Sequence, residues 1–156
     1  MVDGGMNSED SPFSRLAHIS VVVKDINKVV KFYESIGIGP FVAPDNHQFS
    51  TKIYKGEPLK SELIIREARI GAIVLQLVQH IKGDCVVKDF LDRKGEGVYH
   101  LGFLVEDVNK EEEKIGRTGI KVLQKGRRND ESGYAYFDTE EHAGIILEIK
   151  QAPRDR

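Results

Sequence analysis

The feature that most constrains the fold is an internal repeat, in which two parts of the chain match without gaps. The stretch that begins at Leu16 lines up with the stretch that begins at Val98, at a constant offset of 82 positions. The matched pairs are His18 with His100, Val23 with Val105, Asp25 with Asp107, Asn27 with Asn109, Lys28 with Lys110 and Gly37 with Gly119. The chain therefore consists of two copies of one module, and each copy opens with a histidine on its first strand.

Each module has the sequence pattern of a strand, a helix and a series of strands. Residues 17–23 are rich in β-branched side chains, which favour strands. Asp25 is then expected to cap a helix that ends near residue 36, because its carboxylate can accept the free N–H groups of the first turn. The further strands predicted in this module are 49–54, 62–68 and 72–78, with turns at 56–58 and 69–71. In the second module we expect a strand at 98–105, a helix from Asp107 to 117, and strands after residue 119, at 133–138 and at 144–150.

This order of elements predicts an α+β fold built from two copies of one strand–helix–strands module. A length of 156 residues fits one domain. We place that domain at residues 15–151, with modules at 15–80 and 97–151 joined by an amphipathic linker helix at 86–94. The polar, glycine-bearing residues 1–14 are expected to form a flexible tail.

Composition excludes several classes of function. A formal net charge of −2 favours neither nucleic acid nor an anionic membrane surface as a partner. The sequence contains no apolar run near the roughly 20 residues needed to cross a bilayer. The single cysteine, Cys85, cannot form an internal disulfide, so we expect a cytoplasmic protein.

Four polar residues on otherwise apolar strands are the candidate site. The last strands of the modules repeat at an offset of 72, which places Gln76 and Glu148 at equivalent positions. A lone histidine on such a strand is usually a core residue, but a buried carboxylate needs a proton, a cation or a metal. Because equivalent strand positions face equivalent places, we expect His18, Gln76, His100 and Glu148 to converge. Two imidazoles, a carboxylate and an amide oxygen suit a divalent first-row metal.

Two motifs carry a resemblance to a known family. Residues 90–103, FLDRKGEGVYHLGF, form a helix, a Gly-Glu-Gly turn and a histidine strand, and residues 141–148, EHAGIILE, form a closing segment. Together with the repeat, they resemble the vicinal oxygen chelate superfamily, which includes glyoxalase I, methylmalonyl-CoA epimerase, extradiol dioxygenases and bleomycin-resistance proteins. The likeness covers residues 16–151 and is closest to the methylmalonyl-CoA epimerase family. It implies a glyoxalase-like α+β fold, in which two paired βαβββ modules form a curved mixed sheet around a metal cleft. Glyoxalase I usually has Glu where Gln76 stands.

The resemblance implies a metal-dependent isomerase that moves a proton next to a thioester carbonyl. The implied ligands are His18, Gln76, His100 and Glu148, and Glu148 would also be one of two catalytic glutamates. The second glutamate would lie about 16 residues before Gln76, where this chain has Lys60, so Glu57, Glu62 or Lys60 itself is expected to serve.

The implied cofactor is a divalent ion among Co, Mn, Ni, Zn and Fe, and the implied substrate is an acyl-CoA thioester. Lys125, Arg127 and Arg128 form a basic loop that either meets CoA phosphates or is simply solvated. By analogy we expect a homodimer. The alternatives are a glyoxalase I-type lactoylglutathione lyase, an extradiol dioxygenase, against which a Gln76 ligand would count, and a ligand-binding protein without catalysis.

Overall fold

The computed structural model describes residues 10–45 and 48–154. These residues form nine strands and four helices, which confirms the predicted α+β class. The strands are β1 (Leu16–Val22), β2 (Thr51–Tyr54), β3 (Glu57–Pro58), β4 (Glu62–Ile70), β5 (Ile73–Lys82), β6 (Gly97–Leu104), β7 (Val122–Arg127), β8 (Gly133–Phe137) and β9 (Ile146–Lys150). The helices are α1 (Ile26–Ser35), α2 (Val86–Lys94), α3 (Val108–Gly116) and α4 (Glu140–Ala143). None of the helices in the described part of the chain is long and apolar enough to span a bilayer.

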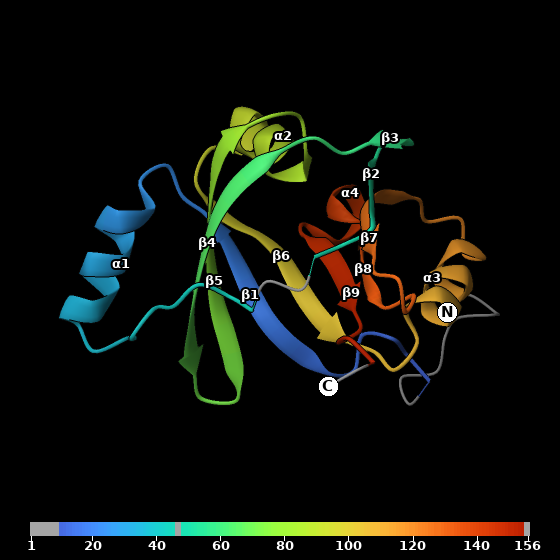
Figure 1. Ribbon diagram of the computed structural model, residues 1–156, viewed down its shortest axis with the longest axis horizontal. Coiled ribbons are helices and arrows are strands. Elements are labelled where there is room, and N and C mark those ends of the chain that lie inside the picture. The colour runs from blue at the N-terminus through green and yellow to red at the C-terminus, as the bar shows by residue number, and fades with distance from the viewer. Residues whose placement is uncertain (1–9, 46–47, 155–156) are drawn as a thin grey trace.

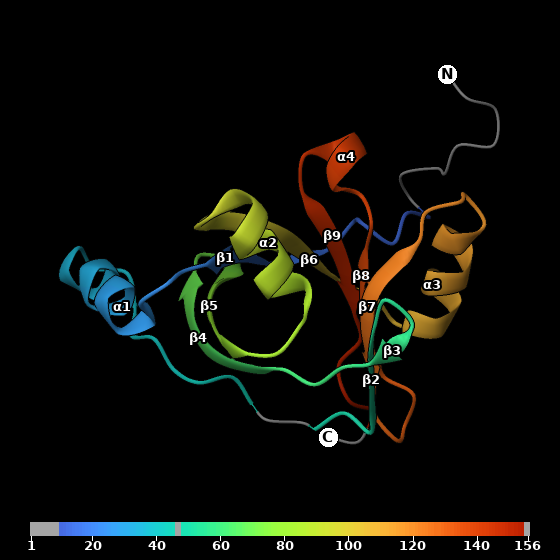
Figure 2. The ribbon, with the colours of Figure 1, turned by 90° about the horizontal axis from the view of Figure 1, so that it is seen from above.

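All nine strands belong to one mixed sheet, in the order β3-β2-β7-β8-β9-β6-β1-β5-β4. The first and last strands of each module pair in parallel, β1 with β5 and β6 with β9, whereas the two modules meet through the antiparallel pair of β1 and β6. Figures 1 and 2 show the sheet curving strongly, with α1 and α3 at opposite ends of the molecule. The two histidine strands therefore lie next to each other at the centre of the sheet.

Aspartate caps begin both module helices, as the repeat predicts. The Asp25 carboxylate accepts from the Lys28 N–H, and the Asp107 carboxylate accepts from the Lys110 N–H. Helix α1 packs on the outer face of the first module, over a cluster that includes Ile26. Helix α3 packs in the same way on the second module, over a cluster that includes Val108 and Ile115.

The inner face of the sheet carries a third apolar cluster, into which the linker helix α2 packs. From α2 it receives Val86, Val87 and Phe90, and from the central strands it receives Val22 and Ile146. Because strand side chains alternate between faces, the residues that share the inner face with Val22 on β1 are His18 and Ser20. Helix α2 thus covers the face of the sheet on which the candidate site lies.

Residues 51–58 connect the two modules in a way that the sequence did not predict. Strand β2 leaves the first module and pairs with β7 of the second, so that Tyr54 lies opposite Gln124. The short strand β3 then folds back on β2. Residues that belong to the first module by sequence therefore complete the edge of the second module's sheet.

Several predicted boundaries are wrong. Glu57 and Pro58 form β3 instead of a turn, and the turn is Lys55-Gly56, where both residues have positive φ. The turn between β4 and β5 is at residues 71–72, because β4 continues through Ile70. The one-turn helix α4 was not predicted, since four residues give too little periodicity to detect.

Part of the predicted tail is packed onto the second module. The Phe13 ring meets the rings of Phe103 and Phe137 edge-on, at centroid distances of 5.3 and 6.4 Å. The Lys114 ammonium also donates to the Asp10 carbonyl oxygen. Residues 10–14 are therefore in contact with the domain, and the rest of the predicted tail, residues 1–9, lies outside the described residues.

Candidate metal centre

Three potential metal ligands converge at the centre of the inner face, one from each of three adjacent strands. His18 on β1 and His100 on β6 place their Nε2 atoms 2.6 Å apart. The Oε1 atom of Glu148 on β9 lies 3.1 Å from the first nitrogen and 3.3 Å from the second. The three side chains are buried, with residue exposures of 2%, 0% and 5% respectively. These groups come from both modules, as the repeat predicts.

Packing helps to orient the two imidazoles, whose Nδ1 atoms have no hydrogen-bond partner among the described residues. Gly102 lies opposite His18 across the β1–β6 pair, and the His18 ring occupies the place of the side chain that Gly102 lacks. The His100 ring lies against the Tyr99 ring at 4.4 Å and the Tyr136 ring at 4.8 Å. Tyr99 is the extra residue of a β-bulge, so both Tyr99 and His100 are buried.

The electrostatics of His100 and Glu148 favour the charge states that metal ligands require. Burial lowers the pKa of His100, although the Glu148 carboxylate acts in the opposite direction. Burial raises the pKa of Glu148, but the imidazoles of His100 and His18 more than offset this and hold that pKa below its ordinary value. Neutral imidazole and ionised carboxylate are the forms that bind a divalent cation.

The donor set fits a divalent first-row metal. Glu148 Oε1 is buried and has no hydrogen-bond donor within residues 10–45 and 48–154, although it faces two imidazole nitrogens. The ligand atoms of His18, His100 and Glu148 all lie within 4.8 Å of one another. A cation between them would satisfy the carboxylate oxygen and both Nε2 lone pairs at once.

Gln76, the fourth predicted ligand, lies next to this group but is bonded elsewhere. On β5 it pairs with Ser20 of β1, one strand away from the histidines. Its Oε1 atom accepts a hydrogen bond from the Ser20 hydroxyl at 2.8 Å, and its Nε2 atom donates to Glu67 Oε2 at 2.9 Å. The structure thus brings three of the four predicted ligands together and places the fourth beside them.

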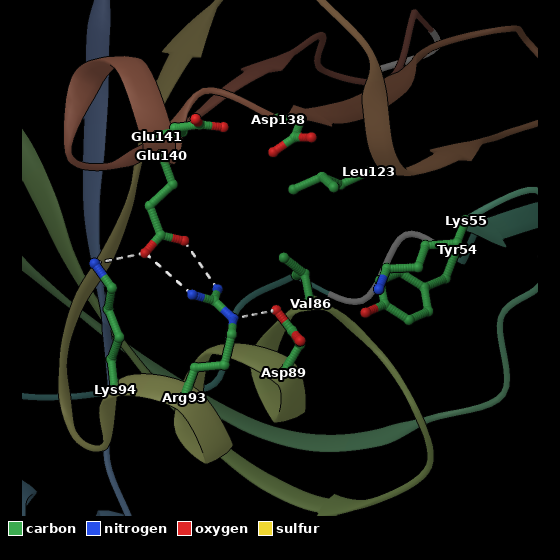
Figure 3. A pocket seen from close by; sticks show the side chains of 10 residues that line it. All are labelled: Tyr54, Lys55, Val86, Asp89, Arg93, Lys94, Leu123, Asp138, Glu140 and Glu141. Carbon is green, nitrogen blue, oxygen red and sulfur yellow. Dashed lines mark hydrogen bonds and ion pairs between the residues drawn. The ribbon is translucent and has the colours of Figure 1, made fainter.

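A pocket of about 480 Å³ lies between the linker helix and the second module, and Figure 3 shows its walls. Arg93 and Lys94 of α2 reach across to Glu140 of α4, with nitrogen–oxygen distances of 2.9 and 2.6 Å. Asp89 holds the same guanidinium from its other side at 2.9 Å. The residues that line the pocket are Tyr54, Lys55, Val86, Asp89, Arg93, Lys94, Leu123, Asp138, Glu140 and Glu141, so none of the three candidate ligands lines it.

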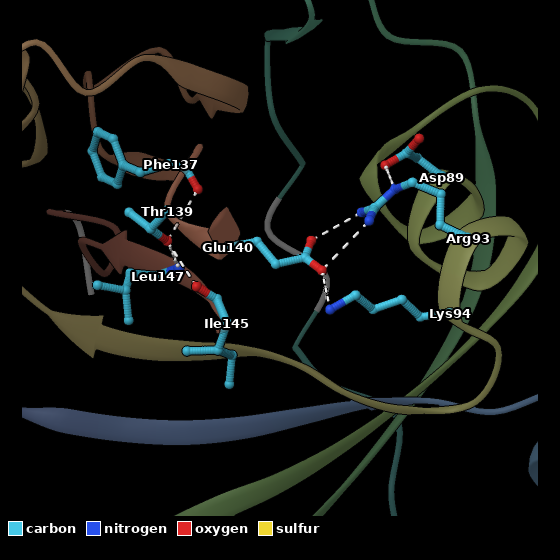
Figure 4. A network of polar contacts seen from close by, with 8 residues as sticks. All are labelled: Asp89, Arg93, Lys94, Phe137, Thr139, Glu140, Ile145 and Leu147. Atoms are coloured by element: carbon cyan, nitrogen blue, oxygen red, sulfur yellow. Dashed lines mark hydrogen bonds and ion pairs between the residues drawn. The ribbon is translucent and has the colours of Figure 1, made fainter. Parts of the chain in front are cut away.

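Helix α4 connects this pocket to the strand that carries Glu148. The Thr139 hydroxyl, next to Glu140, donates to the Ile145 carbonyl and accepts from the Leu147 N–H (Figure 4). Hydrogen bonding to Arg93 lowers the pKa of Glu140, against the effect of burial, so the carboxylate stays ionised. The pocket wall is therefore joined to β9 immediately before the Glu148 ligand.

Comparison with known proteins decides the family. A family model described as the Glyoxalase/Bleomycin resistance protein/Dioxygenase superfamily matches residues 17–137. The chain belongs to this superfamily. It is also 22% identical to the uncharacterized protein YqjC of Bacillus subtilis (strain 168) over 145 residues, which are 92% of this chain and 96% of that protein.

Solved structures share the superfamily fold. The methylmalonyl-CoA epimerase of Mycobacterium tuberculosis superposes with a TM-score of 0.69 at 18% identity, covering 93% of each chain. A Streptomyces coelicolor methylmalonyl-CoA epimerase variant in complex with 2-nitronate-propionyl-CoA gives 0.68 at 23% identity, over 90% of this chain and 95% of that one. At these identities the likeness shows the fold.

The three residues predicted for the second catalytic role lie away from the histidines. Glu62 is exposed and pairs with Lys82, and Lys82 is six positions along β5 from Gln76, or about 20 Å at the usual strand rise. Glu57 is exposed on β3 at the edge of the sheet. Lys60 follows β3, and in the described structure neither it nor Glu57 makes a hydrogen bond or ion pair with the three ligands.

Glu67 is the carboxylate that the sequence prediction missed. It lies opposite Gln76 on β4, because the β4–β5 turn is at residues 71–72. The prediction used the spacing of about 16 residues typical of the epimerase family, whereas the short hairpin of this chain puts the opposing residue only nine positions earlier. Only a turn centred between residues 71 and 72 pairs Gln76 with Glu67, and the predicted turn at 69–71 does not give this register.

The segment predicted as a basic loop is the end of strand β7 and the residue after it, and its basic side chains make other contacts. Glu112 of α3 binds both the Lys125 ammonium, at 3.1 Å, and the Arg127 guanidinium. The Arg128 guanidinium lies over the Phe49 ring, 4.4 Å from its centroid. These contacts favour a structural role for the segment.

Proposed function

We propose that this chain is a metal-dependent isomerase that moves a proton on the carbon next to a thioester carbonyl, with methylmalonyl-CoA as its substrate. One observation carries the proposal: two carboxylates, Glu67 and Glu148, lie on the inner face on opposite sides of the histidine pair. Inverting a carbon centre by proton transfer needs a base on one face and an acid on the other.

The sheet register supports a place for a substrate between the two carboxylates. Glu67 on β4 and Glu148 on β9 are separated by β5, β1 and β6. Four strand spacings of about 4.8 Å put their backbones on the order of 19 Å apart along the sheet, and the curvature of the sheet shortens that distance. Two side chains that point inward from these positions would face an acyl group bound between them.

In the proposed reaction the two carboxylates exchange roles. One ionised carboxylate takes the C2 proton, while the electron pair of the broken C–H bond moves toward the thioester carbonyl oxygen. The other carboxylate, protonated, returns a proton to C2 on the opposite face, so the two glutamates end each turnover with their protonation states exchanged. A metal bound by His18, His100 and Glu148 would supply positive charge for the developing oxyanion.

The surroundings of the site suit this chemistry. The histidines and Glu148 are almost completely buried, which excludes water and strengthens charge interactions. The volume of the neighbouring pocket is within the range of small-molecule sites, so it can accept the part of an acyl-CoA outside the reacting group. The S. coelicolor epimerase variant of the same fold holds 2-nitronate-propionyl-CoA, an acyl-CoA ligand.

The test is proton exchange at C2 of methylmalonyl-CoA in deuterated water, followed by NMR with metal-loaded and chelator-treated protein. We expect metal-dependent exchange, and we expect Glu67→Gln to reduce epimerisation at least 100-fold, within the range typical of general acid–base catalysis. Glu62→Gln is the matched control, since Glu62 is an exposed carboxylate of the same strand.

Two results would contradict the proposal. Fully metallated protein without exchange at C2 would exclude this substrate. Glu67→Gln with the epimerisation rate of the control would remove Glu67 from the reaction and with it the two-carboxylate argument.

A second candidate, an extradiol dioxygenase, is favoured by the bonding of Gln76. With the amide bonded to Ser20 and Glu67, the remaining group is two histidines and one carboxylate, the ligand set of non-haem iron(II) oxygenases. Oxygen uptake by the Fe²⁺-loaded protein with catechol tests it directly. If oxygen is not taken up and the C2 proton does exchange, only the isomerase proposal remains.

The predicted cytoplasmic homodimer stays a prediction. Sedimentation velocity of the purified chain tests whether it is a dimer.

A further inference from the structure

Ser20 lies between Gln76 and the candidate metal centre. In the sheet it pairs with Gln76 of β5 on one side and with His100 of β6 on the other, and along β1 it is two residues from His18. It is fully buried, and its side chain lies on the same face of β1 as the His18 imidazole. A hydroxyl at this position can hydrogen-bond the Gln76 amide and so compete with a metal for it.

The bonding partners fix the orientation of the Gln76 amide. A carboxylate oxygen that carries no proton can only accept hydrogen bonds, and Glu67 Oε2 lies 2.9 Å from the amide Nε2, so the –NH₂ group of the amide faces it. The carbonyl oxygen then faces Ser20, whose hydroxyl donates to it at 2.8 Å. Burial raises the pKa of Tyr99, and a side-chain hydrogen bond with Ser20 partly offsets that rise.

We propose that Ser20 keeps the Gln76 oxygen away from the metal, so that this chain binds a divalent cation through His18, His100 and Glu148 alone. Gln76 is then a positioning residue, which holds the Glu67 carboxylate on the inner face. Three protein ligands leave three positions of an octahedron open for substrate and water, one more than a four-ligand site. The inference rests on the metal site of the proposed function but not on its reaction.

Substitutions at Ser20 and Gln76 separate a ligand from a positioning residue. Gln76→Ala should change Co²⁺ affinity less than about threefold, whereas His100→Ala, which removes a ligand, should reduce it at least 100-fold, the upper end of the loss seen when a supporting residue is removed. Ser20→Ala removes the donor, so the freed amide oxygen should bind the metal and raise Co²⁺ affinity about tenfold. In the Ser20→Ala, Gln76→Ala double variant that gain should disappear, because the two substitutions are coupled.

The measurement is Co²⁺ binding by isothermal titration, together with the visible spectrum of the bound ion, which reports its coordination number without any substrate. Ser132→Ala is the matched control, since Ser132 is an equally buried serine whose hydroxyl bonds to Asp130, in the loop before β8. We expect this control to have the wild-type affinity and spectrum.

The outcomes distinguish the inference from the proposed function. A Gln76→Ala affinity loss as large as that of His100→Ala, or a Ser20→Ala variant with unchanged affinity and spectrum, overturns the inference and leaves the metal site intact. A wild-type protein that binds no Co²⁺ overturns both. If Ser20→Ala does not fold, the Gln76→Ala titration alone decides.

Discussion

Replacing Gly102 with alanine tests whether the metal centre depends on the space that this glycine leaves for the His18 ring. A Cβ atom at Gly102 would lie 2.1 Å from His18 Cε1 and 2.5 Å from both ring nitrogens. Gly102 does not have a positive φ, so alanine strains no backbone angle and the effect is steric.

The structure sets the size of the effect. The ring must retreat by about 0.9 Å to reach even the 3.0 Å below which Cβ contacts essentially never occur. Metal–ligand distances tolerate a deviation of only about 0.2 Å. We therefore expect Gly102→Ala to lose at least tenfold in Co²⁺ affinity, and to lower the free energy of unfolding of the metal-free protein by about 1–3 kcal/mol through overpacking.

The assay combines Co²⁺ titration with urea unfolding of the metal-free protein. Gly116→Ala is the control, because Gly116 ends α3 with no atom within 4 Å of its added Cβ. This control should bind Co²⁺ normally and be as stable as wild type or more stable by up to about 1 kcal/mol. A Gly102→Ala protein that binds Co²⁺ within twofold of wild type and unfolds at the same urea concentration would refute the steric argument.

Three further predictions concern stability. Glu140→Gln removes the ion pair with Arg93 across the pocket, so it should lower the free energy of unfolding by up to about 1 kcal/mol at low salt and by less at 1 M salt. Denaturant unfolding measures this change, and Glu113→Gln, which breaks an exposed ion pair, is the control. Asp107→Ala removes the cap of α3, so it should lower the free energy of unfolding by about 1 kcal/mol in the same assay. A variant as stable as wild type would contradict this prediction. The metal-free protein should lose stability as pH falls below about 6.5, because His100 has a lowered pKa when buried and therefore binds a proton more readily in the unfolded chain. Thermal unfolding from pH 8 to 5.5 should show the melting temperature falling with pH in wild type, and falling less in His100→Gln.

Local signals in the sequence predicted most of the fold. The repeat located both histidine strands, and Asp25 and Asp107 marked the helix starts, because a cap depends only on the next three residues. The linker helix at 86–94 was predicted with its observed bounds, since its apolar residues recur at helical spacing before a glycine. The pairing of β2 with β7 was missed, because nothing within residues 51–54 specifies a partner some 70 positions away.

The site was predicted where symmetry determines it and missed where individual contacts do. The repeat correctly predicted that His18, His100 and Glu148 converge, because the equivalent strands of the two modules meet at the centre of the sheet. It could not show that Ser20 bonds to Gln76, because the second module carries no such pair. Glu67 was missed because its place depends on the length of one hairpin, which a spacing taken from relatives does not give.

The metal ligands have a consequence for how the chain holds together. His18 and Glu148 are 130 positions apart, so an ion bound between them closes a loop that includes most of the polypeptide. Such a cross-link binds only the folded form, and it should raise the melting temperature with the logarithm of free metal concentration. Proteolytic nicking in the linker should leave two fragments that the β1–β6 and β2–β7 strand pairs still join, and a chelator should lower the temperature at which these fragments separate.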